Sequence, residues 1–428
     1  MSTRYDVIVA GGGAAGVGAA VGAAQSGARV ALIERAPFLG GAATLSSVLT
    51  YCGFWTQADP PLRCVGGVGA LVIDEIARYG GYEGPLRMHS SNVVVALLAP
   101  EPVKVALDNV CEAAGVDVIL HALVTGATSH AGRITEITFT DHGGQKHLTA
   151  NAFVDASGDA NLASIAGADT RYGDGSGQVQ NGTLAMRFGG IDRAADVSRN
   201  AWQDAVRHAK SRGVRELSKE HGLVCRLPGS DEVIAFLADE AYDARDARSI
   251  GAAERRGRRQ AWAYLEAIRA MPGHANAYLT STGPAIGTRE SRHILSHYSL
   301  TTADAEDCVQ FPDGIALGGW PVEYHPGPGQ RSVWRRLRDD GAYGIPLRAI
   351  QSRSHHNLFA AGRTLDADAY AFSSVRVMGT AFATGHAAGI AAALSASGAQ
   401  AEPVAVRAEL LRQGAILDAP RPERTRSK

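Results

Sequence analysis

The N-terminal residues carry the pattern that most limits what this chain can fold into. Residues 5–10 are a strand-like apolar run, Tyr-Asp-Val-Ile-Val-Ala, and residues 11–16 read Gly-Gly-Gly-Ala-Ala-Gly. An Ala-rich helix is expected to reach about Ser26, and a second strand over residues 29–33 leads to Glu34. A G-x-G-x-x-G turn between a strand and a helix, followed by an acidic residue, predicts a βαβ unit that binds a dinucleotide.

Each residue type in this turn has a physical task. Gly11 permits the tight turn, Gly13 lets the backbone approach a pyrophosphate, and Gly16 lets helix and strand pack closely. The N–H groups at the start of the helix, where Ala14 and Ala15 lie, are free to face phosphates. An ordinary glycine-rich turn is the plain alternative.

Glu34 decides between two kinds of dinucleotide. Its carboxylate can accept hydrogen bonds from ribose hydroxyls and would repel a 2′-phosphate, so NADP is disfavoured at this site. Arg35 beside it weakens that exclusion slightly. Because the same pattern serves NAD and FAD, other parts of the chain must identify the cofactor.

Charge and cysteine content exclude several classes of partner. Lys and Arg number 42 and Asp and Glu number 43, so no excess charge attracts nucleic acid or an anionic membrane. The five cysteines form no C-x-x-C pair, which argues against a disulfide framework or a zinc knuckle and favours a reducing cytoplasm. No signal peptide is recognised, and the apolar stretch 380–395 is interrupted by His386, so we expect a buried helix and no membrane span.

Seven further blocks follow in order along nearly the whole chain. They are residues 39–44 (Leu-Gly-Gly-Ala-Ala-Thr), 155–159 (Asp-Ala-Ser-Gly-Asp), 286–292, 321–325 (Pro-Val-Glu-Tyr-His), 343–348, 357–363 (Asn-Leu-Phe-Ala-Ala-Gly-Arg) and 374–389. Together with the N-terminal unit they resemble the FAD-dependent oxidoreductase family of the glutathione-reductase-like superfamily, the flavoproteins with two dinucleotide-binding folds.

The resemblance implies an α/β fold with two domains. A discontinuous Rossmann-like FAD-binding domain, with a parallel sheet, helices and a small antiparallel β-meander, is expected over residues 1–169 and 344–402. An inserted mixed α/β substrate or cap domain is expected over 170–343, where longer charged helices are predicted near 195–220 and 252–270. Residues 403–428 are expected to form a C-terminal tail.

The resemblance also assigns cofactor contacts. It places the loop 40–44 beside the flavin ring and the ribityl chain and phosphates near 362–363. It also implies that a helix begins at 378–381 with its positive end toward the flavin's pyrimidine oxygen. The implied contacts beyond the N-terminal unit are Gly40, Gly41, Ala42, Ala43, Thr44, Val124 at the adenine, Gly158, Gly362, Arg363, Met378, Gly379, Thr380 and Ala381. Asp159 is interpreted as the N-cap of the next helix.

The attachment of the cofactor can be predicted as well. Leu45, Ser46 and Ser47 follow Thr44, where relatives that link their flavin covalently carry His or Cys. FAD is therefore expected to bind noncovalently.

Two arginines are the candidates for orienting a substrate. Arg289 and Arg292 are three residues apart, would share a helical face, and could clamp a carboxylate. Surface or inter-domain ion pairing, for example through Glu290, is the alternative. His293 and His297 have a spacing that can hold a metal, but no third ligand is evident, so no metal is expected.

His325 is the first candidate for proton transfer, because imidazole titrates near neutral pH and oxidation of a C–H bond requires a proton acceptor. A structural histidine is the alternative, and Tyr324 and Tyr370 are weaker candidates for the same role. Cys52, just beyond the flavin loop, is interpreted as a small core residue rather than a redox group, since no second cysteine accompanies it.

These expectations define a function and its rivals. We expect an FAD-dependent oxidoreductase, a dehydrogenase or reductase, that moves a hydride between flavin N5 and a small organic substrate that can carry a carboxylate. The alternatives are a flavin-dependent monooxygenase, a redox-neutral isomerase or hydratase that uses reduced FAD, and a non-catalytic flavin-binding protein. The sequence identifies neither the electron donor or acceptor nor the oligomeric state.

Overall fold

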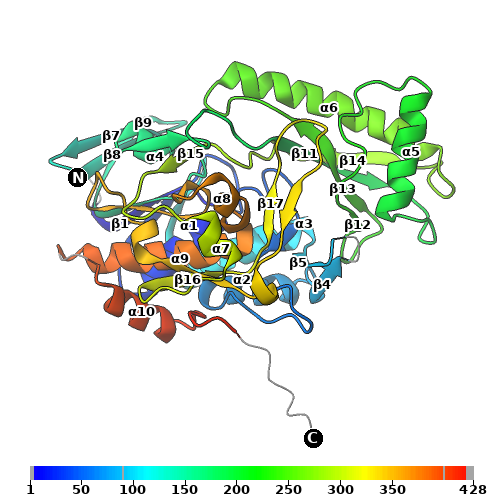
Figure 1. The fold of residues 1–428 in the computed structure, drawn as a ribbon. Coiled ribbons are helices and arrows are strands. Elements are labelled where there is room, and N and C mark those ends of the chain that lie inside the picture. Colours follow the sequence, from blue (N-terminus) through cyan, green and yellow to red (C-terminus); the bar gives the residue numbers. More distant parts are fainter. Residues whose placement is uncertain (1–3, 89–90, 399–400, 421–428) are drawn as a thin grey trace, which may run out of the picture.

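The strand, turn and helix at the N-terminus begin a seven-stranded mixed sheet in the computed structural model (Figure 1). The structure describes residues 4–88, 91–398 and 401–420. The strand order is β6-β2-β1-β9-β8-β7, and β20 pairs with β9. The strands are β1 (Arg4–Ala10), β2 (Val30–Ile33), β6 (Asp117–Ile119), β7 (Leu123–His130), β8 (Arg133–Asp141), β9 (Gly144–Asp155) and β20 (Leu358–Ala360).

Strand β9 joins the two parts of this sheet. Its second half runs parallel to β1 and β20, and β1 runs parallel to β2. Its first half pairs antiparallel with β8, which pairs antiparallel with β7. The predicted fold class, a Rossmann-like parallel sheet with an antiparallel meander, is thereby confirmed.

Alternation along β1 explains how both faces of the sheet are covered. Val7 points into a core shared with helices α1 (Ala14–Gln25) and α9 (Met378–Ser395). Ile8 points to the opposite face and packs in a cluster with Phe139 of the meander. A strand buried on both faces requires a continuous apolar sequence, which is what residues 7–10 provide.

Helices α1 and α9 cross at very short distance because glycines face the partner backbone. A methyl group at Gly385 would lie 2.0 Å from the Ala15 carbonyl oxygen, and one at Gly389 would lie 1.9 Å from the Ala19 carbonyl oxygen. This contact aligns the starts of the two helices, and both helix starts line the cavity described below.

We expect Gly389→Ala to lower the free energy of unfolding by about 2 kcal/mol, because the added methyl group forces the two helices apart. Chemical denaturation measures the loss. Gly251→Ala is the matched control: Gly251 also lies in a helix, and a methyl group there meets only the Arg255 side chain at 3.7 Å. Equal stabilities for the two variants would contradict the close crossing.

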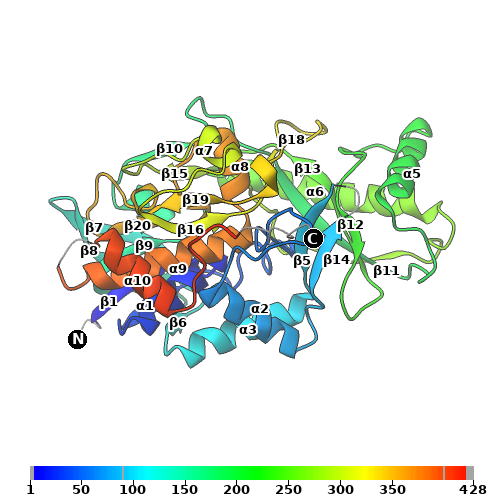
Figure 2. The same cartoon turned by 60° about the horizontal axis from the view of Figure 1, so that its bottom comes forward.

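Residues between β2 and β6 form two helices and a small sheet. The sheet has the order β3-β5-β4, and α2 and α3 lie side by side (Figure 2). Pro100 starts α3, where its missing N–H costs no hydrogen bond. The bounds are β3 (Thr50–Cys52), α2 (Gly67–Arg78), β4 (Pro85–Met88), β5 (Val93–Leu97) and α3 (Pro100–Ala113).

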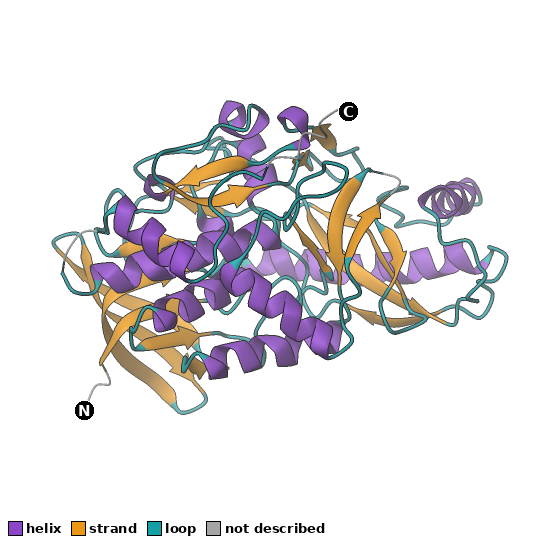
Figure 3. Ribbon diagram, turned by 90° about the horizontal axis from the view of Figure 1, so that it is seen from below, coloured by secondary structure: helices purple, strands orange, loops and turns teal. Residues whose placement is uncertain are grey.

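The cap is built on a four-stranded sheet with its own helices (Figure 3). Its strand order is β12-β13-β11-β14, and its helices begin at side-chain caps: Ser198 for α5 and Asp246 for α6. The bounds are β11 (Gly182–Gly189), α5 (Arg199–Ser211), β12 (Val224–Arg226), β13 (Val233–Glu240), α6 (Ala247–Arg269) and β14 (Tyr278–Thr282).

The helix predicted near 195–220 is shorter in the structure. It ends at Ser211, and the chain then turns through Gly213, which has a φ of +91°. The helix predicted over 252–270 begins earlier, at Ala247, because the Asp246 carboxylate accepts hydrogen bonds from the N–H groups of Arg248 and Ser249.

The hydrophobic cores divide the chain differently from the expected domain boundaries. The cap core contains buried residues from Leu184 to Ile286, whereas buried residues from Leu300 to Tyr343 belong to the core of the nucleotide half. The inserted unit is therefore shorter than 170–343. Helix α10 (Pro403–Arg412), expected as part of a tail, packs its Val406 and Leu410 into the same nucleotide-half core.

The remaining elements connect these units. They are α4 (Asn161–Ile165), β10 (Thr170–Tyr172), β15 (Arg292–Ile294), α7 (Thr302–Glu306), β16 (Gly314–Gly318), β17 (Val322–Tyr324), β18 (Val333–Arg335), β19 (Tyr343–Pro346) and α8 (Ala369–Val375), with 3-10 turns at Arg338–Asp340, Leu347–Ala349 and Gly362–Thr364. Within the described ranges no single helix is both long and apolar enough to cross a membrane; only α8 and α9 together reach that length and composition, and the chain bends by 90° between them.

Candidate active site

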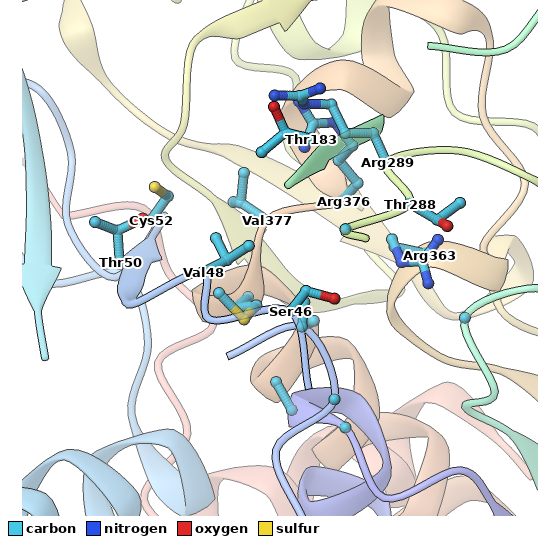
Figure 4. Close-up of a pocket in the computed structure, with 18 of the residues that line it drawn as sticks. Ser46, Val48, Thr50, Cys52, Thr183, Thr288, Arg289, Arg363, Arg376 and Val377 are labelled. Carbon is cyan, nitrogen blue, oxygen red and sulfur yellow. The ribbon is translucent and has the colours of Figure 1, made fainter. Parts of the chain in front are cut away.

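A deep cavity runs from the glycine-rich turn of α1 to the cap (Figure 4). Its volume is about 370 Å³, within the range of pockets that hold small ligands and cofactors. Of the predicted residues, those that line it are Gly11, Gly13, Ala14, Ala15, Glu34, Arg35, Gly41, Ala42, Gly158, Gly362, Arg363, Met378, Ala381, Arg289 and His325. The cavity thus joins the predicted cofactor contacts to the first-choice catalytic candidates.

The glycine-rich turn before α1 lines one end of the cavity. Gly13 is the N-cap of α1, no side chain caps the helix, and no acidic residue occupies its first turn. The first N–H groups of α1 are therefore available to an anion. A methyl group on Gly13 would come no closer than 3.7 Å to Gly41, so the surface there is open to a ligand that needs close backbone contact.

Glu34 is held in place by the backbone around it. Its Oε2 accepts a hydrogen bond from the Gly12 N–H at 2.6 Å, and its Oε1 accepts one from the Ala36 N–H at 2.8 Å. Each carboxylate oxygen has a second lone pair, so the group can still accept from ribose hydroxyls. The side chain is 8% exposed, and the small opening is toward the cavity.

We expect Glu34→Gln to weaken FAD binding about tenfold. The substitution replaces one acceptor oxygen by an NH2 group, which would face a backbone N–H and could not accept a hydrogen bond from the ribose. Fluorescence titration of the apoprotein with FAD measures the dissociation constant. Glu83→Gln, at an exposed position outside the cavity, is the control. Unchanged affinity in the Glu34 variant would contradict the assignment of this carboxylate to the cofactor.

Polar atoms without partners surround the middle of the cavity. Arg363 Nη1 lies 3.5 Å from Asp159 Oδ1, and both buried atoms lack a hydrogen-bond partner among the described residues. Asp159 is not the N-cap predicted for the following helix. Asp155 and Ser157 instead accept hydrogen bonds from the N–H groups of Ala163 and Asn161, because the chain turns through a left-handed Ala160.

Other predicted cofactor residues lie beside the cavity without lining it. Gly16 packs on Gly11, and a methyl group on Gly16 would lie 1.8 Å from the Gly11 carbonyl oxygen, which is consistent with its expected packing role. The other predicted contacts do not line the cavity either. Gly40, Ala43 and Thr44 are buried within the loop, and Thr380 is buried in the first turn of α9. Gly379 packs against Cys52 and Phe54, and Val124 lies in β7 opposite Phe139.

The cap end of the cavity carries two guanidinium groups. Arg289 and Arg376 both line it, and Figure 4 shows them near Thr183. Arg289 donates to the Asn181 carbonyl oxygen and lies 3.7 Å from Asp239. Arg376 donates to the Glu323 carbonyl oxygen at 3.3 Å, and its buried Nε has no partner among the described residues. Both groups therefore keep donors for a ligand.

Arg292 does not join this pair, so the prediction of a shared helical face is wrong. Residues 287–291 form no helix, and Arg292 begins strand β15. Its guanidinium points to the Asp159 carbonyl oxygen at 3.3 Å and to Asn161 at 3.4 Å. A strand start in place of a helical turn separates the two arginines.

His325 and Glu323 face the cavity together because they are two residues apart at the end of β17. His325 Nε2 lies 3.3 Å from Glu323 Oε1, and its Nδ1 lies 3.0 Å from the Ser332 hydroxyl. Tyr324, between them, faces the other way and packs 5.2 Å from the ring of Tyr370. The structure thus separates Tyr324 from the proton-transfer candidates.

Burial and charge fix the ionisation of this pair. Burial, together with the positive charge of Arg289, lowers the pKa of His325 to about 3, although Glu323 acts in the opposite direction. Burial opposes ionisation of Glu323, but its hydrogen bond and charge interaction with His325, followed by the charges of Arg376 and Arg289, outweigh it and lower the pKa of Glu323 to about 2. At neutral pH a neutral imidazole therefore lies beside a carboxylate.

Several residues at this end were missed by the sequence analysis. Glu323 and Arg376 lie inside the recognised blocks, and the alternation of β17 could have grouped Glu323 with His325. Lys219 lines the cavity and lies 3.8 Å from Asp239, and both come from cap segments without a recognisable motif. Tertiary contacts alone bring Lys219 to the cavity wall.

The remaining candidates have other surroundings. His293 is buried, with Nδ1 3.0 Å from the Leu365 carbonyl oxygen and Nε2 3.2 Å from Glu290. In the part of the chain that the structure describes, no cluster of three His, Cys, Asp or Glu side chains could hold a metal. Cys52 lines the cavity rather than the core alone, and burial raises its pKa to about 12, so it is a thiol.

Comparison with protein families identifies the chain at this point. The model of the FAD dependent oxidoreductase family matches residues 6–413. The chain belongs to this family. The family is defined by its cofactor, and the cavity described above joins every block on which the resemblance rested except the one at 343–348. No curated protein matches the chain in sequence.

Solved structures resemble the family member only distantly. A geranylgeranyl bacteriochlorophyll reductase-like protein from Thermoplasma acidophilum is 14% identical, with 96% of this chain and 83% of that chain covered and a TM-score of 0.47. A p-nitrophenol 4-monooxygenase from Pseudomonas putida is 12% identical, with 70% of each chain covered and a TM-score of 0.43. The flavin-dependent brominase Bmp2 is 11% identical, with 96% and 84% covered and a TM-score of 0.47. These likenesses carry no argument about chemistry.

The residues of the cavity fit FAD. The uncapped start of α1 and the exposed backbone at Gly13 suit a pyrophosphate, and the oriented Glu34 carboxylate suits a ribose. The start of α9 at Met378 supplies the positive end of an 18-residue helix to the same cavity. Leu45 and Ser46 line this region, where a covalent link would require His or Cys.

Proposed function

We propose that this FAD-dependent oxidoreductase moves a hydride between the flavin and a small carboxylate-bearing substrate bound at the cap end of the cavity. One observation carries the proposal: Arg289 and Arg376 line the same half-enclosed space, and acidic groups do not fully neutralise the charges there. FAD, when bound, supplies the hydride acceptor or donor. The protein supplies the binding, orientation and proton transfer.

The charge balance at the cap end favours an anion. Arg199, Lys219, Arg289 and Arg376 line this end, where Glu323 is the lining carboxylate. Asp239 lies behind the wall, 3.8 Å from Lys219 and 3.7 Å from Arg289. Burial lowers the pKa of Arg376 to about 10, which still leaves it protonated at neutral pH. Positive charge is therefore in excess in a space partly withdrawn from water, where an ion pair with a carboxylate is stronger than at the surface.

His325 is the group that can accept a proton at this end. Its Nε2–H donates to Glu323, which leaves Nδ1 as the acceptor for the Ser332 hydroxyl or for a substrate proton. A bound carboxylate would add negative charge beside His325 and raise its pKa from about 3. Substrate binding would thus strengthen the base that the reaction requires.

Anaerobic titration of the purified holoprotein tests the proposed function. The probes are small carboxylic acids, each compared with its own methyl ester, together with amines and NAD(P)H. We expect one class of carboxylic acid to bleach the flavin absorbance and the matched esters to act far more weakly, because only the acid can pair with Arg289 and Arg376.

Other outcomes would assign the protein differently. Oxygen consumption coupled to a hydroxylated product, with NAD(P)H as reductant, would assign a monooxygenase. Turnover that requires prior reduction but shows no net electron transfer would assign an isomerase or hydratase. A flavin that no compound reduces would leave a binding protein, and equal bleaching by acids and esters would overturn the role of the two arginines.

A further inference from the structure

A second cavity opens beside the cap end of the first. It is lined mainly by the start of α5, the loop before β5, and the segment around β18. The residues shared by both cavities are Ser91, Val93, Arg199, His221, Ser332 and Trp334. The two cavities therefore adjoin, and the second reaches the protein surface, where Arg331 and Trp334 are exposed.

This outer cavity has positive charge without a matching acidic group. Arg335 pairs with Glu306 at 3.1 Å, and Arg336 pairs with Asp340 at 2.6 Å. The other arginines of the lining are Arg199, at the start of α5, and Arg331, in the loop before β18; neither has an ion pair within residues 4–88, 91–398 and 401–420.

His221 and Lys219 extend this charge inward. Arg199 and His221 line both cavities, Lys219 lines the inner one and Arg331 the outer one. Burial, followed by the charges of Lys219, Arg199 and Arg331, lowers the pKa of His221. Lys219 is 4% exposed and lines the inner cavity. A row of basic groups therefore leads from the surface toward Arg289.

The passage between the two basic regions is partly apolar. Trp334 lines both cavities and lies 6.2 Å from the ring of Trp320, which lines the inner one. Val93 also lines both. A ligand that spans the two regions would place its ends among cations and its middle against indole rings.

We propose that the substrate carries two acidic groups separated by an apolar middle, with one acid at Arg289 and Arg376 and the second at Arg199 and Arg331. This inference rests on the proposed function and extends it to the substrate class. Simple steering of anions by the outer arginines would speed the association of all carboxylates alike. A second binding site instead predicts tighter equilibrium binding for molecules with two acids.

Perturbation of the flavin spectrum in the full-length holoprotein measures equilibrium binding of suitable probes. The probes are α,ω-dicarboxylates from glutarate to sebacate, each compared with the monocarboxylate of the same chain length. We expect one range of lengths to bind roughly three to ten times more tightly than the matched monocarboxylate, because arginines that remain in contact with solvent contribute modestly. This ratio should shrink as salt is raised.

Variants separate the outer site from the inner one. In Arg199→Ala/Arg331→Ala the ratio of the two dissociation constants should fall to about one. Arg255→Ala is the matched control, since this exposed cap arginine lines neither cavity and has no ion pair among the described residues, and it should keep the full ratio.

Two negative results have different meanings. Mono- and dicarboxylates that bind equally at every length, or an unchanged ratio in the double variant, would overturn the second acid site while leaving the proposed function in place. Failure of both probe types to perturb the flavin, with Arg289→Ala equally silent, would instead remove the proposed function.

Discussion

His325→Gln is expected to slow the reduction of the flavin by substrate on the order of 1,000-fold, because the variant removes the group that accepts the substrate proton. Glutamine keeps a similar volume and can still hydrogen-bond to Ser332, so substrate binding should change much less than the rate. Anaerobic stopped-flow measurement of the reduction rate and the substrate dissociation constant separates the two effects.

The pH dependence gives this prediction a second readout. The pKa of His325 is lowered to about 3 in the free protein, so the imidazole stays neutral as pH falls from 8 to 5 and remains able to accept a proton. An exposed histidine would be protonated below about pH 6.5, and the rate constant divided by the dissociation constant would fall there. With His325 as the base, we expect no such fall at this pH. His297→Gln, at an exposed position outside the cavity, is the control. A His325 variant that reduces its flavin at the wild-type rate would contradict the assignment.

Arg289→Ala is expected to weaken binding of the substrate carboxylate about 100-fold, equivalent to roughly 2.7 kcal/mol. The variant removes a charge-assisted hydrogen bond and leaves Lys219 to neutralise Asp239. Arg289→Lys should recover part of the affinity, because it restores the positive charge but not the bidentate hydrogen bonding of a guanidinium group. Flavin difference spectra give the dissociation constants.

The control for this prediction must change charge without touching the cavity. Arg255→Ala meets that requirement on the cap surface. Because loss of Arg289 could also alter the cap, thermal unfolding of each variant should be compared. Loss of affinity in Arg289→Ala with an unfolding midpoint like that of Arg255→Ala would assign the effect to binding, whereas unchanged affinity would place the substrate elsewhere.

The cofactor end could be predicted from sequence because its physics is local. Gly11, Gly13 and Glu34 are fixed by a short strand, a turn and a helix whose geometry follows from a few residues. The start of α9 at Met378 was instead implied by the family resemblance. Val124 also came from the resemblance, and the structure places it in the meander, outside the cavity.

The substrate end could be predicted only in part because it depends on distant segments. Arg289 was found, but its partner is Arg376, 87 residues later, and not Arg292. The error came from assuming a helix where the chain is irregular before β15. Lys219 belongs to the cap, whose sequence has no recognisable motif, so only packing reveals that it lies at the cavity, with Asp239 behind it at 3.8 Å.

The most direct test of the account combines a change in the protein with a change in the substrate. Once a reducing acid is known, its reduction rate constant divided by its dissociation constant should be compared with that of its methyl ester, in the wild type and in Arg289→Ala. We expect the wild type to prefer the acid about 100-fold and the variant to prefer it only a few-fold. The reason is that the negative charge of the substrate strengthens binding only when the positive charge of Arg289 is present. An undiminished preference in Arg289→Ala would contradict the claim that this arginine, at the cap end of the FAD cavity, recognises the substrate carboxylate.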